Sequence, residues 1–157
     1  LMQDEAVEVV TKKLLPMASL LTPNVPEAEV LAGIPINDKD SMEKAAHIIH
    51  SKGCKALLIK GGHIEGRKID RLYTAMGMER EYEAANVATR NTHGTGCTLS
   101  SAITSYLAMG YAIGEAIAAA KEWLTGALIA GANVEIGSGH GPVNHFYNPQ
   151  KTIIKTK

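Results

Sequence analysis

A run of glycines and small hydroxyl residues leads directly into a predicted helix in the second half of the chain. Gly94, Thr95 and Gly96 precede Cys97, and apolar residues then follow at the spacing of one helix face. These apolar residues are Leu99, Ala102, Ile103, Tyr106 and Leu107. The first N–H groups of a helix have no partner within the helix, and the helix dipole adds partial positive charge there. We therefore expect residues 94–97 to bind a phosphate or a developing oxyanion.

Cys97 falls in the first turn of this predicted helix. The field of the helix end favours a thiolate, so Cys97 can serve as a nucleophile or as a proton acceptor. A lone cysteine is also a common small core residue, and this alternative stays open. The loop lacks the Gly-Lys-Ser/Thr of a Walker A motif and the third glycine of a dinucleotide fingerprint, so neither nucleotide motif applies.

The loop resembles the hydroxymethylpyrimidine and phosphomethylpyrimidine kinases of thiamine biosynthesis, which are ribokinase-like kinases. Most ribokinase-like kinases carry aspartate where this chain has Cys97, whereas the cysteine with its flanking Thr-His and Thr-Leu-Ser is similar to the pyrimidine kinases. Three further motifs agree in order, at residues 21–29, 59–63 and 139–145. The resemblance runs from residue 1 to about residue 149. It implies a three-layer α/β/α fold with a mainly parallel sheet.

Members of this family begin with a further portion that has no counterpart here. We therefore expect residues 1–157 to be the C-terminal part of a single ribokinase-like kinase domain, truncated at its N-terminus. The resemblance implies phosphorylation of 4-amino-5-hydroxymethyl-2-methylpyrimidine and its monophosphate, with ATP and Mg²⁺ as cofactors. The alternatives are a non-catalytic nucleotide-binding fragment, one half of a split kinase, and a pyridoxal kinase. Expected partners are the pyrimidine, the nucleotide, and a second copy or a complementing N-terminal portion.

By the same resemblance, the loop glycines and Thr95 stabilise the transferring phosphoryl group, and Cys97 accepts or orients the proton of the substrate hydroxyl. Asn24 and Glu27 stand three apart, the spacing of a capping box at the start of a helix. The resemblance adds an indirect role for these two residues, in which they hold magnesium through ordered water. Both roles are compatible, because capping fixes the carboxylate that polarises the water.

Lys60 ends an apolar run, residues 56–60, and is followed by two glycines. A strand that ends in a glycine loop is where open α/β sheets place ligands, so Lys60 is expected beside a nucleotide phosphate. A surface lysine beside a turn is the alternative. The resemblance assigns Thr89 and Asn91 to the lining of the nucleotide pocket.

The remaining patterns predict the elements that hold these residues. Helices are expected at residues 5–15, ended by Pro16, from Asp38 or Asp40 to about residue 52, and at residues 113–130. Residues 18–21 are expected to form a buried strand, and residues 68–74 and 79–85 a hairpin of exposed strands. His47 and His50 are expected on a solvated helix face, with a metal site as the alternative. His140 and His145 are expected to be capped loop histidines, and a site role for either is the alternative.

Composition limits the function classes. The chain has 157 residues, of which 45% are hydrophobic, and it carries 16 basic and 16 acidic residues. This balance leaves no broad charge for nucleic acid or an anionic membrane, so neither is an expected partner. The two cysteines have neither disulfide-framework nor metal spacing, which favours a cytoplasmic location.

Overall fold

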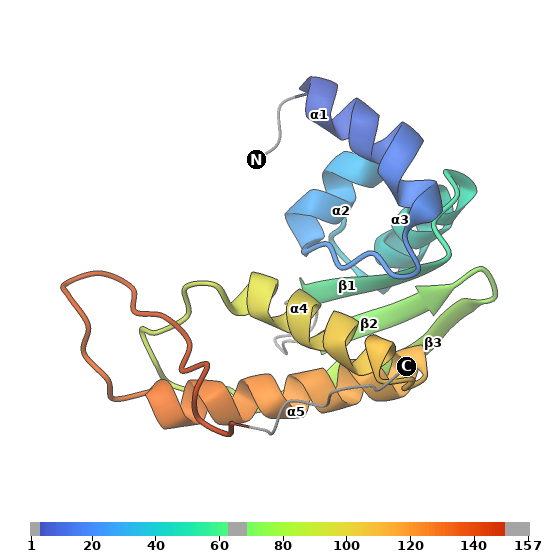
Figure 1. Cartoon of the computed structure of the whole chain (residues 1–157). Coiled ribbons are helices and arrows are strands. Elements are labelled where there is room, and N and C mark those ends of the chain that lie inside the picture. Colours follow the sequence, from blue (N-terminus) through green and yellow to red (C-terminus); the bar gives the residue numbers. More distant parts are fainter. Residues whose placement is uncertain (1–3, 63–68, 150–157) are drawn as a thin grey trace. The chain divides into compact units, whose positions relative to one another are not determined.

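The computed structural model describes residues 4–62 and 69–149, and the chain divides into two compact units, Leu1–Glu83 and Ala84–Lys157 (Figure 1). In the first unit, α1 (Asp4–Val9) continues as a π-helical turn, η1 (Val10–Leu14), and a 3₁₀ turn, η2 (Leu15–Met17). The predicted single α-helix ending at Pro16 is therefore wrong in its second half. Pro16 lies inside η2, where its missing N–H and fixed φ are tolerated but regular α-helical bonding is not.

Two further helices of this unit begin where the sequence predicted. α2 (Val25–Ala32) starts at Asn24, and α3 (Lys39–Ser51) starts at Asp38, whose side chain accepts a hydrogen bond from the N–H of Ser41. The four apolar residues expected to face inward on α3 are all buried, namely Met42, Ala45, Ala46 and Ile49. They join residues of α2 and of the sheet in one hydrophobic core.

The sheet consists of β1 (Ala56–Gly62), β2 (Ile69–Thr74) and β3 (Gly77–Glu83), in that order, with both pairs antiparallel. The predicted hairpin is confirmed, with its turn at residues 75 and 76. Its strands were expected to be exposed, which holds for β3 but not for β2. β2 is the middle strand, and its Tyr73 belongs to the core that α2 and α3 form over one face of the sheet.

Residues 18–21 do not form the predicted strand. Leu21 makes only an isolated parallel bridge to Leu57, with N–O distances of 2.9 Å to Ala56 and 2.8 Å from Leu58. Pro23 has no N–H to donate and Asn24 already opens α2, so the pairing stops after a few residues. Helices packed on a sheet confirm the α/β class. Among the described residues, parallel pairing is confined to isolated bridges.

The second unit is built on two helices that pack side by side, α4 (Thr95–Ala108) and α5 (Ile113–Gly131) (Figure 1). Gly110, with φ of 95°, makes the turn between them. The predicted inner face of α5 is confirmed at Ile117, Ala120 and Leu124, while Leu128 is half-buried. The small alanines on this face let the two helices approach closely.

The chain leaves α5 as a loop that returns across that helix. Tyr147 lies against Gly126, where a Cβ atom would be 2.3 Å from the tyrosine oxygen, and its ring lies 5.8 Å from that of Trp123. A parallel bridge joins His93 to Pro142. In the described part of the chain, no helix is both long and apolar enough to span a membrane.

Candidate functional site

The N-terminus of α4 carries no side-chain cap. Gly94 is the N-cap, with φ of 81° and ψ of 2°, and its carbonyl accepts the first helical bond from Thr98 at 2.8 Å. A Cβ atom at Gly94 would meet nothing within 4 Å, so this left-handed backbone conformation, not space, favours glycine. A Ser, Thr, Asp or Asn at this position would offer its oxygen to the next free N–H groups. Glycine leaves them open.

The open groups are the backbone N–H groups of Gly96 and Cys97. Among the described residues, neither has an acceptor, whereas the side chain of Thr95 donates to the carbonyl of Thr92 at 2.6 Å. Two adjacent N–H groups at the positive end of a 14-residue helix are suited to binding an anion, and this role stays a prediction. The structure therefore brings together Gly94, Thr95, Gly96 and Cys97 as the sequence predicted.

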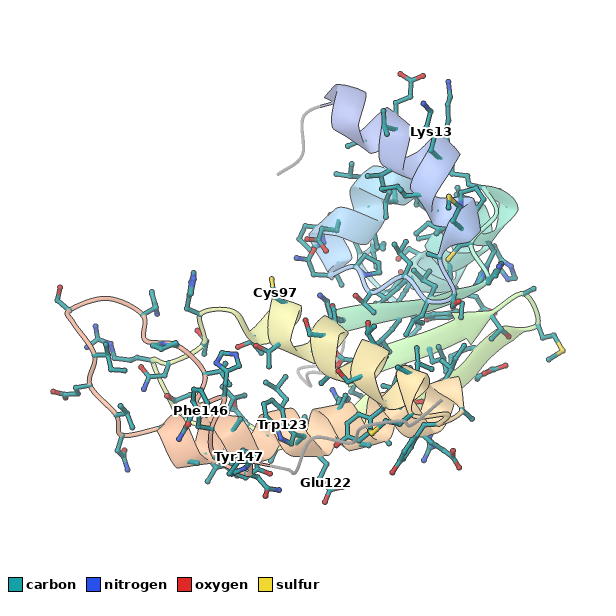
Figure 2. The ribbon with its side chains drawn as sticks, in the orientation of Figure 1. Lys13, Cys97, Glu122, Trp123, Phe146 and Tyr147 are labelled. Atoms are coloured by element: carbon teal, nitrogen blue, oxygen red, sulfur yellow. The ribbon has the colours of Figure 1, made fainter. Side chains whose placement is uncertain are left out.

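Cys97 is exposed and unpaired, and Figure 2 shows its side chain at the first turn of α4, directed away from α5. The second cysteine differs in its exposure and in its contacts. Cys54 is buried, its thiol donates to the carbonyl of Ala56, and burial raises the pKa of this thiol to about 11. Between the two, Cys97 is the residue available for chemistry.

The loop before α4 is fastened to the far end of α5. The side-chain amide of Asn91 donates to the carbonyls of Gly131 and Val134, at 2.6 and 2.7 Å. The hydroxyl of Thr89 donates to Ala132 at 3.2 Å and accepts from the N–H of Asn91 at 3.0 Å. These contacts fix the backbone that leads into Gly94, and a role in lining a nucleotide pocket stays a prediction for both side chains.

A cleft of about 360 Å³ opens in the same unit. It is lined by Arg90, Asn91 and residues 132–139. Arg90 and Asn91 lie four and three residues before Gly94, so the loop that forms the open helix end also borders the cleft. Sequence reasoning missed residues 132–139 because irregular, polar loops carry no periodic pattern.

In the first unit, Asn24, Glu27 and Lys60 are neighbours. The predicted capping box is confirmed: Asn24 accepts from the N–H of Glu27, and Glu27 accepts from the N–H of Asn24, both at 2.8 Å. Lys60 is half-buried near the end of β1, its N–H donates to Pro23 at 2.8 Å, and it bridges to Asn24. The backbone of Lys60 therefore lies beside the start of α2.

This set of donors fits a magnesium ion held through water. Capping occupies the side-chain oxygen of Asn24 and one oxygen of Glu27, which leaves the second carboxylate oxygen of Glu27 to accept from water. Within residues 4–62 and 69–149, no three His, Cys, Asp or Glu side chains group as direct ligands. Mg²⁺ commonly keeps several waters and few protein ligands, so one outer carboxylate is compatible with it.

The four histidines differ in their exposure and in their contacts. His47 is exposed with Glu43 at 3.9 Å, as expected, but His50 is half-buried and its Nδ1 lies 2.7 Å from the carbonyl oxygen of Cys54. The solvated face predicted for His50 is therefore wrong, because the chain turns back over it after α3. His140 Nδ1 lies 3.3 Å from the carbonyl oxygen of Arg90, and His145 contacts α4 itself.

Known proteins resemble the chain over nearly its whole length. The Geobacter sulfurreducens thiamine biosynthesis bifunctional protein ThiED is 45% identical over 142 residues, which are 90% of this chain and 28% of that protein. The Rhizobium meliloti hydroxymethylpyrimidine/phosphomethylpyrimidine kinase is 41% identical over 148 residues, 94% of this chain and 56% of that one. The solved ADP complex of Bacillus subtilis pyridoxal kinase is 35% identical, with a TM-score of 0.80 over 91% of this chain and 54% of that chain.

The chain therefore spans about half the length of the kinases it matches. The model of the phosphomethylpyrimidine kinase family matches residues 1–144, which include the first unit, most of the second and every candidate site residue predicted from the sequence. The chain belongs to the phosphomethylpyrimidine kinase family.

Proposed function

We propose that the protein transfers the γ-phosphoryl group of ATP to the hydroxymethyl group of 4-amino-5-hydroxymethyl-2-methylpyrimidine, and then phosphorylates the resulting monophosphate. The observation that carries this proposal is the open N-terminus of α4, with two free N–H groups and an exposed Cys97 in one turn. The family match and the kinase relatives support the reaction class.

Phosphoryl transfer depends on positioning and on neutralising charge. In this proposal, the N–H groups of Gly96 and Cys97 donate to the oxygens of the transferring phosphoryl group, where negative charge must be held. The bond from Thr95 to Thr92 fixes the loop that carries them. The Cys97 side chain accepts or orients the proton of the substrate hydroxyl. The oxygen of that hydroxyl then attacks the γ-phosphorus.

Roles are also proposed for residues of the first unit, on the family resemblance alone. Lys60 is proposed to pair with the β and γ oxygens of ATP, and Glu27, oriented by Asn24, is proposed to hold a water on magnesium. When bound, magnesium supplies charge neutralisation to the same oxygens. Asn91 and the cleft that it lines are assigned to the nucleoside of ATP, because a volume of about 360 Å³ suits a ligand of that size.

The test is an ATP-dependent assay of the full-length protein with the hydroxymethyl pyrimidine and its monophosphate. We expect Cys97→Ala to lower kcat by about a hundredfold or more, as expected for loss of a general base. Cys97→Asp is expected to retain more activity than Cys97→Ala. Equal loss in both variants would contradict the proton-accepting role, and no phosphorylation by the parent protein would contradict the proposed function.

Pyridoxal kinase activity is the second candidate, and the resemblance to the Bacillus subtilis pyridoxal kinase is the observation that favours it. Both activities would use the same open helix end, so the residues described here do not distinguish them. The discriminating measurement is kcat/KM for pyridoxal and for the pyrimidine with one enzyme preparation. A higher value for pyridoxal would reverse the order of the two candidates.

The assembly of the active protein is also part of the proposal. Both units are assigned to one kinase domain, because a single family match covers them. The proposed partner is a second copy of the chain or a complementing N-terminal portion. The second possibility is tested by adding that portion to residues 1–157 and measuring activity. A cytoplasmic location is proposed because Cys54 and Cys97 are both unpaired thiols.

A further inference from the structure

The segment that follows α5 contacts the first turn of α4 through a histidine. Nε2 of His145 lies 3.0 Å from Oγ1 of Thr98, a distance at which one of the two groups donates to the other according to the histidine tautomer. Thr98 is buried, with 9% of its surface exposed, and it directly follows Cys97. His145 itself is exposed at the surface of the second unit.

The hydroxyl of Thr98 behaves differently from those further along α4. Ser100, Thr104 and Ser105 each donate to the carbonyl four residues earlier, at 3.1, 2.9 and 3.0 Å. Such back-bonding is the usual choice of a hydroxyl inside a helix, and it tends to bend the helix. For Thr98 the corresponding acceptor would be the carbonyl of Gly94, the N-cap of the open turn. Among the described residues, the Thr98 hydroxyl makes no such bond and contacts His145 instead.

The same segment holds the loop before α4 at a second place. The N–H of His93 donates to the carbonyl of Gly141 at 3.1 Å. Gly141 also lies against Asn91, because a Cβ atom at position 141 would be 2.0 Å from the Asn91 side-chain oxygen. Residues 141–145 therefore contact the chain on both sides of the open turn.

This segment is itself anchored on α5. Figure 2 shows Tyr147 beside Trp123, and the ring centroids lie 5.8 Å apart. The close approach of Tyr147 to Gly126 fixes the end of the segment two residues after His145. His145 therefore extends from a segment that is fastened at both ends.

We propose that His145 is a positioning residue for the open turn of α4. By anchoring Thr98 to the segment that follows α5, it keeps the N–H groups of Gly96 and Cys97 aimed at the anion. The effect of His145 on catalysis rests on the proposed function, whereas its effect on the structure of the turn does not. Without the contact between His145 and Thr98, the first turn of α4 loses this anchor and the donors move out of line.

The test compares five single variants and one double variant with the parent protein. His145→Ala removes the contact, and Thr98→Val removes its partner while keeping the shape of the side chain. His145→Gln is the rescue, because its amide reaches the position of Nε2, whereas the shorter amide of His145→Asn does not. Ser105→Ala, at a back-bonded position on the same helix, is the matched control. Thermal unfolding of each variant establishes that it is folded.

In the full-length enzyme, we expect His145→Ala and Thr98→Val each to lower kcat about fivefold to tenfold, the equivalent of one hydrogen bond. The KM for ATP is expected to change less than the kcat, because the donors act on the transferring group. The double variant is expected to match either single variant, and His145→Gln to recover most of the activity. Additive losses, or the same loss in Ser105→Ala, would overturn the proposal.

A second readout does not depend on kinase activity. Iodoacetamide alkylates the exposed Cys97 in preference to the buried Cys54, and its rate depends on the N–H groups that stabilise negative charge on sulfur. We expect His145→Ala and Thr98→Val to slow alkylation of Cys97 about threefold. An unchanged rate would overturn the positioning role, whereas a parent protein without kinase activity would contradict only the proposed function.

Discussion

The helices α2 and α4 begin in opposite ways. At α2, the side chain of Asn24 and the carboxylate of Glu27 occupy each other's backbone N–H groups at 2.8 Å. At α4, Gly94 offers no side chain, and the N–H groups of the second and third helical residues, Gly96 and Cys97, are open among the described residues. Both helix ends carry the same partial positive charge. The cap residue decides whether that charge stabilises the helix or is left for a ligand.

The two ends also differ in how they are held. The capping box of α2 is complete within four consecutive residues. The open turn of α4 depends on distant parts of its unit, through Asn91 to the end of α5 and through Thr98 to His145. A helix end without a cap loses local stabilisation, and contacts from elsewhere in the chain restore its geometry.

The largest effect is expected from closing the open end. Gly94→Asp places a carboxylate where it can accept from the free N–H groups and repel a phosphate. We expect kcat/KM in the full-length kinase to fall by about a hundredfold or more, the effect of losing one such donor. Steady-state kinetics at saturating acceptor measure this effect.

Gly94→Ala is the matched control, since it carries the strain of the left-handed backbone without a capping oxygen. Its cost should be about 1 kcal/mol of stability, measured by denaturant unfolding. If Gly94→Ala were as inactive as Gly94→Asp, strain and not closure would explain the loss, and the comparison would fail.

A smaller effect is expected from removing the negative charge of Glu27 at the start of α2 while keeping that helix capped. The amide oxygen of Glu27→Gln can still accept from the N–H of Asn24, so α2 stays capped. If Glu27 holds a water on magnesium, the magnesium concentration for half-maximal activity should rise about tenfold, as for other outer carboxylates. A magnesium titration of the full-length kinase measures it. An unchanged titration curve would leave Glu27 with capping alone.

Removing the side-chain cap of α2 should lower the stability of the protein. Asn24→Ala removes the oxygen that accepts from Glu27 and is expected to lower the free energy of unfolding by about 1 kcal/mol. Asn24→Ser keeps a capping oxygen and should lose little. Urea unfolding of the three proteins checks the order, and an Asn24→Ala protein as stable as the parent would show that the box contributes nothing.

The smallest effect concerns the buried cysteine. Burial raises the pKa of Cys54 from its ordinary value of 9.0 to about 11, so the unfolded chain ionises first as the pH rises. The contribution of the buried, neutral thiol to the free energy of unfolding is present below pH 9 and is lost between pH 9 and 11. We expect the unfolding midpoint to fall over this range, and to fall less in Cys54→Ser. Equal slopes in both proteins would exclude Cys54 as the cause.

Sequence reasoning succeeded where the determining contacts are local. Asn24 and Glu27 are three residues apart, and so are Asp38 and Ser41, so each cap can be read from spacing alone. The alternating residues of the hairpin and the glycine before α4 are equally local patterns. The open end of α4 could therefore be predicted as a candidate site.

The contacts that support this site could not be predicted. Thr98 and His145 are 47 positions apart, and Asn91 is 40 positions from Gly131, so no periodicity or motif joins them. The burial of β2 was missed for the same reason, since its neighbours come from α3. The strand predicted at residues 18–21 is reduced to one bridge at Leu21, because Pro23 and the capping box at Asn24 compete with strand formation.

The most direct test of the account is the response of individual backbone amides to ATP, followed by ¹⁵N–¹H NMR of the full-length protein. We predict that the amide resonances of Gly96 and Cys97 move downfield as they begin to donate to phosphate oxygens. The amide of Ser41, which already donates to the capping Asp38, should not move. Saturation with ATP that leaves the Gly96 and Cys97 resonances in place would contradict the claim that the open end of α4 is the phosphate site.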